Sequence, residues 1–221
     1  MPRNVKVPLA GCVACVAALA LLALCVFGAD AVQRVDTAML TRLVADPGSR
    51  AESLGSGLAR LGDPPALLLM LALACGVALV RRRPGNAAAA LLVVAGANLT
   101  TQMLKVLLGH PRVQLALGAD QIAWSTFPSG HVTAAASIAI AFAFALPRSL
   151  LPAVAALGLC LVSAVSYAVL ALAWHYPSDI LGGILVASAW GFAVLAALRL
   201  AKAEIARPAP QLGRRAAISV K

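Results

Sequence analysis

The stretch Leu150–Ala173, LLPAVAALGLCLVSAVSYAVLALA, decides the fold class because it is long, apolar and without charge. A hydrocarbon core about 30 Å thick needs roughly 20 apolar residues, at about 1.5 Å of rise per residue. Five more apolar runs flank it, and the six runs are Val7–Gly28, Pro64–Val80, Asn86–Leu104, His131–Pro147, Leu150–Ala173 and Ile180–Leu198. None alternates with period 2, so the sequence predicts an all-α bundle of six transmembrane helices.

The composition agrees with a membrane protein. Of the 221 residues, 62% are hydrophobic and 12% are charged, whereas a soluble domain is roughly half apolar and a quarter charged. The net charge of +10 does not indicate a nucleic-acid partner, because the basic residues stand in short blocks between apolar runs. We expect one membrane-embedded domain over 1–221, with a disordered cytoplasmic tail at about 205–221.

The basic blocks predict the orientation. Six crossings place twelve of the 18 basic residues on one side, and by the positive-inside rule that side is the cytoplasm of a bacterial-type inner membrane, with both termini inside. The twelve are Arg3, Lys6, Arg81, Arg82, Arg83, Arg148, Arg199, Lys202, Arg207, Arg214, Arg215 and Lys221. Ala29-Asp30-Ala31 resembles a signal cleavage site, but the first run is longer than a signal peptide's apolar region, so we expect it to be retained.

A short amphipathic helix is predicted on the outer side, after the first run. Its apolar residues recur at helical spacing at Val32, Val35, Met39 and Leu43. Such a helix either lies on the outer membrane surface or packs over the bundle, and the pattern does not choose between these arrangements.

Three outward segments carry the residues that could take part in catalysis or ligand binding. Lys105 to Arg112 ends the third run with two cations, Phe127-Pro128-Ser129-Gly130-His131 opens the fourth, and His175-Tyr176-Pro177-Ser178-Asp179 opens the sixth. A helix start offers free N–H groups to an anion. Asp179 is spaced to fix the tautomer of His175 and leave its other nitrogen nucleophilic. The set suits metal-free phosphoryl transfer, although snorkelling cations and hydrated histidines are the alternative for any one residue.

Together the segments resemble the signature of the type-2 phosphatidic acid phosphatase superfamily, which also includes the vanadium haloperoxidases. The family pattern is Lys-x6-Arg-Pro, then Pro-Ser-Gly-His, then Ser-Arg-x5-His-x3-Asp, and the similarity covers most of the chain. The resemblance implies a phosphatase for lipid phosphate or pyrophosphate, working at the periplasmic face without metal or cofactor. His175 would be the nucleophile that forms a phosphohistidine, Asp179 would orient it, and His131 would be the general acid. The residues implied to hold the phosphate are Lys105, Arg112, Ser129 and Gly130.

The chain departs from the pattern at two places. Val113 replaces the Pro of the first motif, and Ala168-Val169 replaces the Ser-Arg of the third. A charge-assisted hydrogen bond contributes about 1.5–3 kcal/mol, so the missing cation could slow catalysis roughly 10- to 100-fold. Arg50 or Arg60 of the outer loop is a candidate substitute.

Three other functions compete with a phosphatase. A non-catalytic relative that only binds lipid phosphate would explain Val169, but His131, His175 and Asp179 are all present. A haem-binding bundle with His131 and His175 as axial ligands leaves Lys105, Arg112 and Asp179 unexplained. A transporter would be indicated by broken mid-helix segments with midplane charges, and the sequence has none. Neither the identity of the lipid nor the oligomeric state can be read from the sequence.

Overall fold

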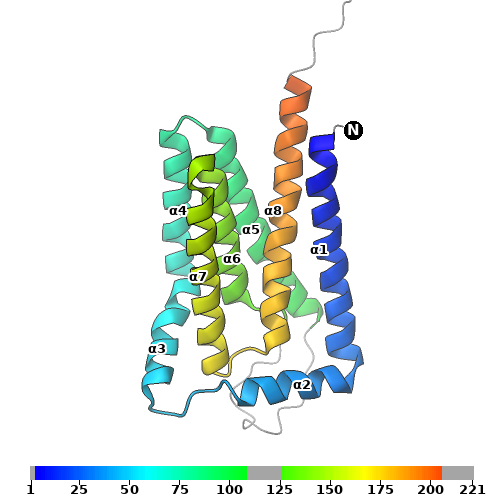
Figure 1. Ribbon diagram of the computed structural model, residues 1–221, viewed down its shortest axis with the longest axis vertical. Helices are drawn as coiled ribbons and strands as arrows, with labels where there is room; N and C mark the ends of the chain where they lie inside the picture. The colour runs from blue at the N-terminus through cyan, green and yellow to red at the C-terminus, as the bar shows by residue number, and fades with distance from the viewer. Residues whose placement is uncertain (1–2, 109–125, 206–221) are drawn as a thin grey trace, which may run out of the picture.

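The computed structural model describes residues 3–108 and 126–205, and these fold as helices joined by short connections (Figure 1). Its α-helices are α1 (Arg3–Gly28), α2 (Asp30–Thr41), α3 (Arg50–Ala59), α4 (Pro64–Val80), α5 (Pro84–Leu107), α6 (Gly130–Ala145), α7 (Leu151–Ala171) and α8 (Pro177–Ile205). Two short 3₁₀ helices, η1 (Arg60–Gly62) and η2 (Arg148–Leu150), precede α4 and α7.

An all-α membrane bundle is the observed architecture, as the sequence predicts. In the described ranges four helices are long and apolar enough to cross a bilayer, namely α1, α5, α7 with η2, and α8. A fifth span results if α3 with η1 and α4, which bend by 48°, count as one. By length and composition alone, the described helices therefore support at most five of the six predicted crossings. The helix α6 has 16 residues, or about 24 Å, because it starts only at Gly130 and Pro147 follows its end.

The helices α6 and α8 form the centre of the bundle. Helix α8 packs against α1, α5 and α6, while α6 also packs against α4 and α7. Small side chains fill one of these contacts, where Ala97, Ala136 and Ala187 are buried with Val186. Small residues let helix backbones approach closely, which replaces the hydrophobic drive that lipid removes.

The two ends of the bundle differ in charge (Figure 1). The N-terminus, the α4–α5 and α6–α7 connections and the end of α8 lie together, and we call this the basic end. Its described cations are Lys6, Arg81, Arg82, Arg83, Arg148, Arg199 and Lys202. The opposite end, which we call the α2 end, holds α2, α3 and the starts of α6 and α8.

The helix α2 crosses the α2 end of the bundle, and it has features of both predicted arrangements. Leu40 is buried against Tyr176, so one face packs over the bundle. Val35, Met39 and Leu43 of the apolar stripe are exposed, which leaves that face for a membrane surface.

Candidate active site

The residues of the three motifs lie together at the α2 end, on three elements that are distant in sequence. Lys105 is in the last turn of α5, Ser129 caps α6, and His131 is in the first turn of α6. His175 lies in the α7–α8 connection, and Asp179 is in the first turn of α8. Arg112 lies outside the described residues, as do His110 and Val113.

His175 is held by the carboxylate of Asp179. The Oδ2 atom of Asp179 lies 3.4 Å from Nδ1 of His175 and accepts a hydrogen bond of 2.9 Å from the backbone N–H of Tyr176. Asp179 is fully buried, and His175 is 6% exposed. Because the carboxylate accepts hydrogen bonds, it favours the tautomer with the proton on Nδ1, and Nε2 then carries the lone pair.

The end of α7 sets the position of His175. Ala173 adopts a left-handed backbone conformation with φ of 55°, which stops the helix in the manner of a Schellman cap. The backbone N–H groups of Trp174 and His175 both donate to the carbonyl of Val169, at 2.9 and 3.3 Å. The main chain of position 169 therefore lies directly beside His175.

Val169 itself points into apolar surroundings. Its side chain is fully buried in a cluster with Val132, Val165 and Ile180. Val132 follows His131 and Ile180 follows Asp179, so this cluster lies directly beneath the candidate site. No cation replaces the missing Arg in this cluster, and Arg50 and Arg60 are exposed, without a hydrogen bond or ion pair to the described residues.

The first turn of α6 is fixed by Ser129. Its Oγ accepts from the N–H of Val132 at 3.5 Å, and its own N–H donates to the carbonyl of Asp179 at 2.9 Å. The second hydrogen bond ties the start of α6 directly to the start of α8. The Pro-Ser-Gly-His and His-x3-Asp segments are thus held in one rigid arrangement.

Close approach of α6 and α8 requires glycine at position 183. A Cβ atom there would lie 2.8 Å from the carbonyl oxygen of Ser129 and 3.0 Å from Oγ1 of Thr133, which is closer than real Cβ contacts allow. Thr133 also bonds Thr101 of α5 at 3.0 Å, so three helices meet below the site. Sequence reasoning does not single out Gly183, although a Gly-Gly pair soon after the third motif is a usable signal.

Lys105 brings a cation to the start of α6. A Cβ atom added to Gly130 would lie 3.7 Å from Nζ of Lys105. Lys105 lies within electrostatic range of the Asp179 carboxylate, and His131 lies within range of Lys105 and His175. These side chains therefore share one electrostatic environment, in which a cation adjoins a helix N-terminus that favours an anion.

His131 has a carboxylate partner that the sequence motifs do not contain. Its Nε2 lies 3.2 Å from Oδ1 of Asp63, the residue that precedes α4. The His131 ring packs against the ring of Trp174, with centroids 5.5 Å apart. Gly62 also contacts it, since a Cβ there would be 2.9 Å from the His131 ring. In the sequence Asp63 resembles an ordinary helix-start residue before Pro64, so only the tertiary fold reveals this pair.

A second carboxylate, Asp36, attaches α2 to the site. Its Oδ1 accepts from the N–H of Ser178 at 3.1 Å, and its Oδ2 is hydrogen-bonded to the Ser178 hydroxyl. Asp36 is buried and so caps the start of α8 from another helix. Within residues 3–108 and 126–205, no three His, Cys, Asp or Glu side chains gather as a metal site would require.

Comparison with known proteins gives one structural and one family match. The fold is similar to the "Crystal structure of the first transmembrane PAP2 type phosphatidylglycerolphosphate phosphatase from Bacillus subtilis", with a TM-score of 0.73 and 23% sequence identity. The match covers 89% of this chain and 98% of that chain. Comparison with the curated proteins finds no match.

The family model of the PAP2 superfamily matches residues 86–202, from the start of α5 to near the end of α8. That range contains all three motif segments and both helix starts that form the candidate site. The chain therefore belongs to the PAP2 superfamily.

Proposed function

We propose that the protein is a metal-independent phosphatase for a lipid phosphate or lipid pyrophosphate. The observation that carries this proposal is the buried His175–Asp179 pair beside a second histidine, a lysine and a helix N-terminus. Family membership and the structural likeness to a phosphatidylglycerolphosphate phosphatase support it. The exposed apolar face of α2 next to the site suits a substrate that stays in the bilayer.

The reaction proceeds in two displacements. Nε2 of His175 attacks phosphorus, the bond from phosphorus to the lipid oxygen breaks, and that oxygen takes a proton from His131. Water then attacks the phosphohistidine while His131 takes a proton from it. The bond from phosphorus to nitrogen breaks, and phosphate leaves. Asp179 holds the His175 tautomer throughout.

The phosphate oxygens are held by Lys105 at the end of α5, by Ser129 and Gly130 at the start of α6, and by Arg112, which lies outside the described residues. Interactions aimed at the transferring group are the main source of catalysis in metal-free phosphoryl transfer. Burial disfavours a charged His131 ring, and the hydrogen bond with the Asp63 carboxylate partly offsets that effect while it orients the ring for proton donation.

The proposed topology has six crossings, with both termini in the cytoplasm and the site at the outer face. The positive-inside rule supports it, because most of the described cations lie at the basic end, namely Lys6, Arg81, Arg82, Arg83, Arg148, Arg199 and Lys202. In this arrangement α4 and α6 cross as well, with the bilayer thinned or flanking residues recruited at their ends.

Phosphate release from a panel of phosphorylated lipids by purified protein tests the function. We expect His175→Ala to abolish release and phosphohistidine trapping, and Asp179→Asn to retain a small fraction of activity. EDTA should leave the wild-type rate unchanged, and vanadate, which mimics the transferring phosphoryl group, should inhibit. Near-wild-type release by a folded His175→Ala variant, or a strict Mg²⁺ requirement without vanadate inhibition, would contradict the proposal.

A non-catalytic lipid-phosphate-binding protein is the second candidate, because Val169 stands where the family pattern has Arg. It predicts vanadate or lipid-phosphate binding without release from any lipid in the panel. Measurable release that depends on His175 would exclude it.

A further inference from the structure

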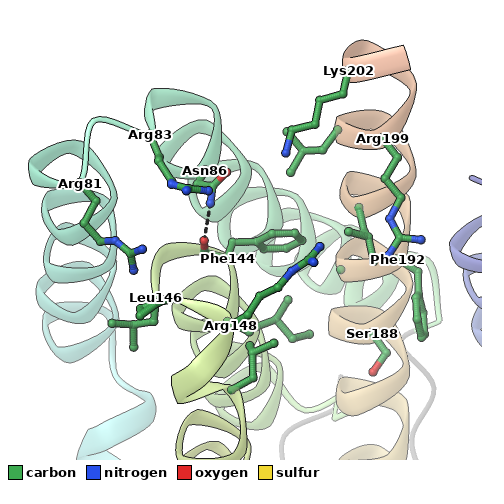
Figure 2. Close-up of a pocket in the computed structure, with 17 residues that line it drawn as sticks. Arg81, Arg83, Asn86, Phe144, Leu146, Arg148, Ser188, Phe192, Arg199 and Lys202 are labelled. Atoms are coloured by element: carbon green, nitrogen blue, oxygen red, sulfur yellow. Dashed lines mark hydrogen bonds between the residues drawn. The ribbon is translucent and has the colours of Figure 1, made fainter. Parts of the chain in front are cut away.

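A cavity of about 860 Å³ opens at the basic end (Figure 2), at the opposite end of the bundle from the candidate active site (Figure 1). It lies between the α4–α5 and α6–α7 connections on one side and the last turns of α8 on the other. Among the described residues five cations line it and no carboxylate does: Arg81, Arg83, Arg148, Arg199 and Lys202. In Figure 2 the side chain of Arg148 extends toward α8, and Lys202 projects from α8 toward it.

Only two of these cationic side chains, Arg81 and Arg199, have hydrogen-bond partners among the described residues. Arg81 donates to the carbonyl of Ala145 at 3.4 Å, where it helps to cap α6, and Arg199 donates to the carbonyl of Asn4. A guanidinium has five N–H donors, so both keep donors for a ligand. The side chains of Arg83, Arg148 and Lys202 form no hydrogen bond or ion pair with any residue of the described ranges, and all three residues are exposed.

The cations gather around more than one hollow. A neighbouring cavity of about 460 Å³ is lined by Arg148, Arg199 and Lys202 again, together with Asn4 of α1. These three side chains thus lie between two spaces that are open to solvent or headgroups. Close packing of like charges is unfavourable unless an anion occupies the space between them.

The deeper wall of the larger cavity is apolar. It is lined by Ile140, Phe144, Leu151, Phe192, Leu195 and Leu198. A cationic rim above an apolar slot matches an amphiphile with an anionic head, whereas free phosphate would use the rim alone. The positive-inside rule explains cations at this end, but it does not explain why they converge from three separate elements on one cavity.

We propose that this cavity binds an anionic phospholipid from the leaflet at the basic end. Arg148, Arg199 and Lys202 bind its phosphate, and an acyl chain lies along the apolar wall. Basic pockets between transmembrane helices are a known way of recognising anionic headgroups. The site is separate from the candidate active site and does not depend on catalysis there.

Native mass spectrometry of the purified full chain, titrated with phosphatidylglycerol in mild detergent, tests the proposal. The double variant Arg148→Gln, Lys202→Gln should bind the lipid at least tenfold more weakly than the wild type. The control variant Lys6→Gln, Arg82→Gln removes the same charge from the same end without touching either cavity, and it should bind within about twofold of the wild type. Lipid bound at the α2 end would be retained equally by both variants.

Two further ligands distinguish recognition of an anionic lipid from recognition of a phosphate group alone. Phosphatidylcholine should bind at least tenfold more weakly than phosphatidylglycerol, and inorganic phosphate should not displace phosphatidylglycerol at millimolar concentration. Phosphatidylglycerol should also raise the Tm of the wild type and of the control, but not that of the Arg148, Lys202 variant. Equal lipid binding by the two double variants, or full displacement by inorganic phosphate, would overturn the proposal.

Discussion

Asp63, the residue that precedes α4, provides His131 with a charged partner 3.2 Å from Nε2. The carboxylate orients the ring and partly offsets the burial that disfavours its protonated form, so we propose Asp63 as a positioning residue for proton donation. Asp63→Asn should lower kcat about tenfold and leave KM within about twofold, because binding of the phosphate does not use this group. Steady-state kinetics with a lipid phosphate measures both constants.

The variant Asp63→Glu is the control for this assignment, because it keeps the carboxylate at slightly different reach. It should recover part of the lost kcat, whereas a merely structural role at the start of α4 would be met equally well by Asn. Equal kcat values for the Asn variant and the wild type would remove Asp63 from the mechanism.

Helix α2 is held against the start of α8 through the side chain of Asp36. Asp36→Ala removes a buried carboxylate that accepts from both the N–H and the hydroxyl of Ser178. Hydrogen bonds to a charged group contribute about 1.5–3 kcal/mol, so we expect a lower Tm and a lower kcat as His175 loses support. Asp30→Ala, an exposed acid on the same helix, should change neither. Equal Tm values for the two variants would show that α2 is not held through Asp36.

The third motif lacks its cation near the end of α7 that lies at the α2 end of the bundle. Val169 lies directly beneath the site, so Val169→Arg should let the guanidinium reach the phosphate and tighten vanadate binding about tenfold, or about 1.4 kcal/mol. Val165→Arg is the matched control, because Val165 is equally buried in the same cluster but one turn further from the site. It should only lower the Tm. A folded Val169→Arg protein with unchanged vanadate affinity and turnover would show that position 169 does not face the phosphate.

The sequence predicts those parts of the site that are local in the chain. The pairing of His175 with Asp179 and the helix start at Ser129 follow from spacing within a few residues, so the order of the amino acids is enough to predict them. The roles of Asp36 and Asp63 are not predictable in this way, because each lies on an element whose packing against α8 or α6 depends on the tertiary fold. The basic residues indicate only topology in the sequence, since their convergence on one cavity depends on how three distant connections meet.

The molecule as a whole is electrically asymmetric, with cations on every connection at the basic end and paired histidines and carboxylates at the α2 end. This asymmetry is the reason that the proposed hydrolytic site and the proposed lipid-binding cavity can coexist in a small bundle. The two lie at opposite ends and draw on different cations. An orientation that places the basic end in the cytoplasm puts the candidate active site at the outer surface.

Two exposed helical glycines test this orientation in intact cells. Gly57 on α3 shares a face with Ser53 and Arg60 at the α2 end, and Gly85 opens α5 at the basic end. A Cβ at either position meets no atom within 4 Å, so a cysteine fits both without strain. The five native cysteines lie in α1, α4 and α7, where lipid and packing shield them from a charged maleimide.

Gly57→Cys should be labelled in intact spheroplasts and Gly85→Cys only after permeabilisation, because the reagent cannot cross the bilayer. The unsubstituted protein reports the background. Labelling of Gly85→Cys from outside would show that the bundle has the reverse orientation, with the candidate active site at the cytoplasmic leaflet.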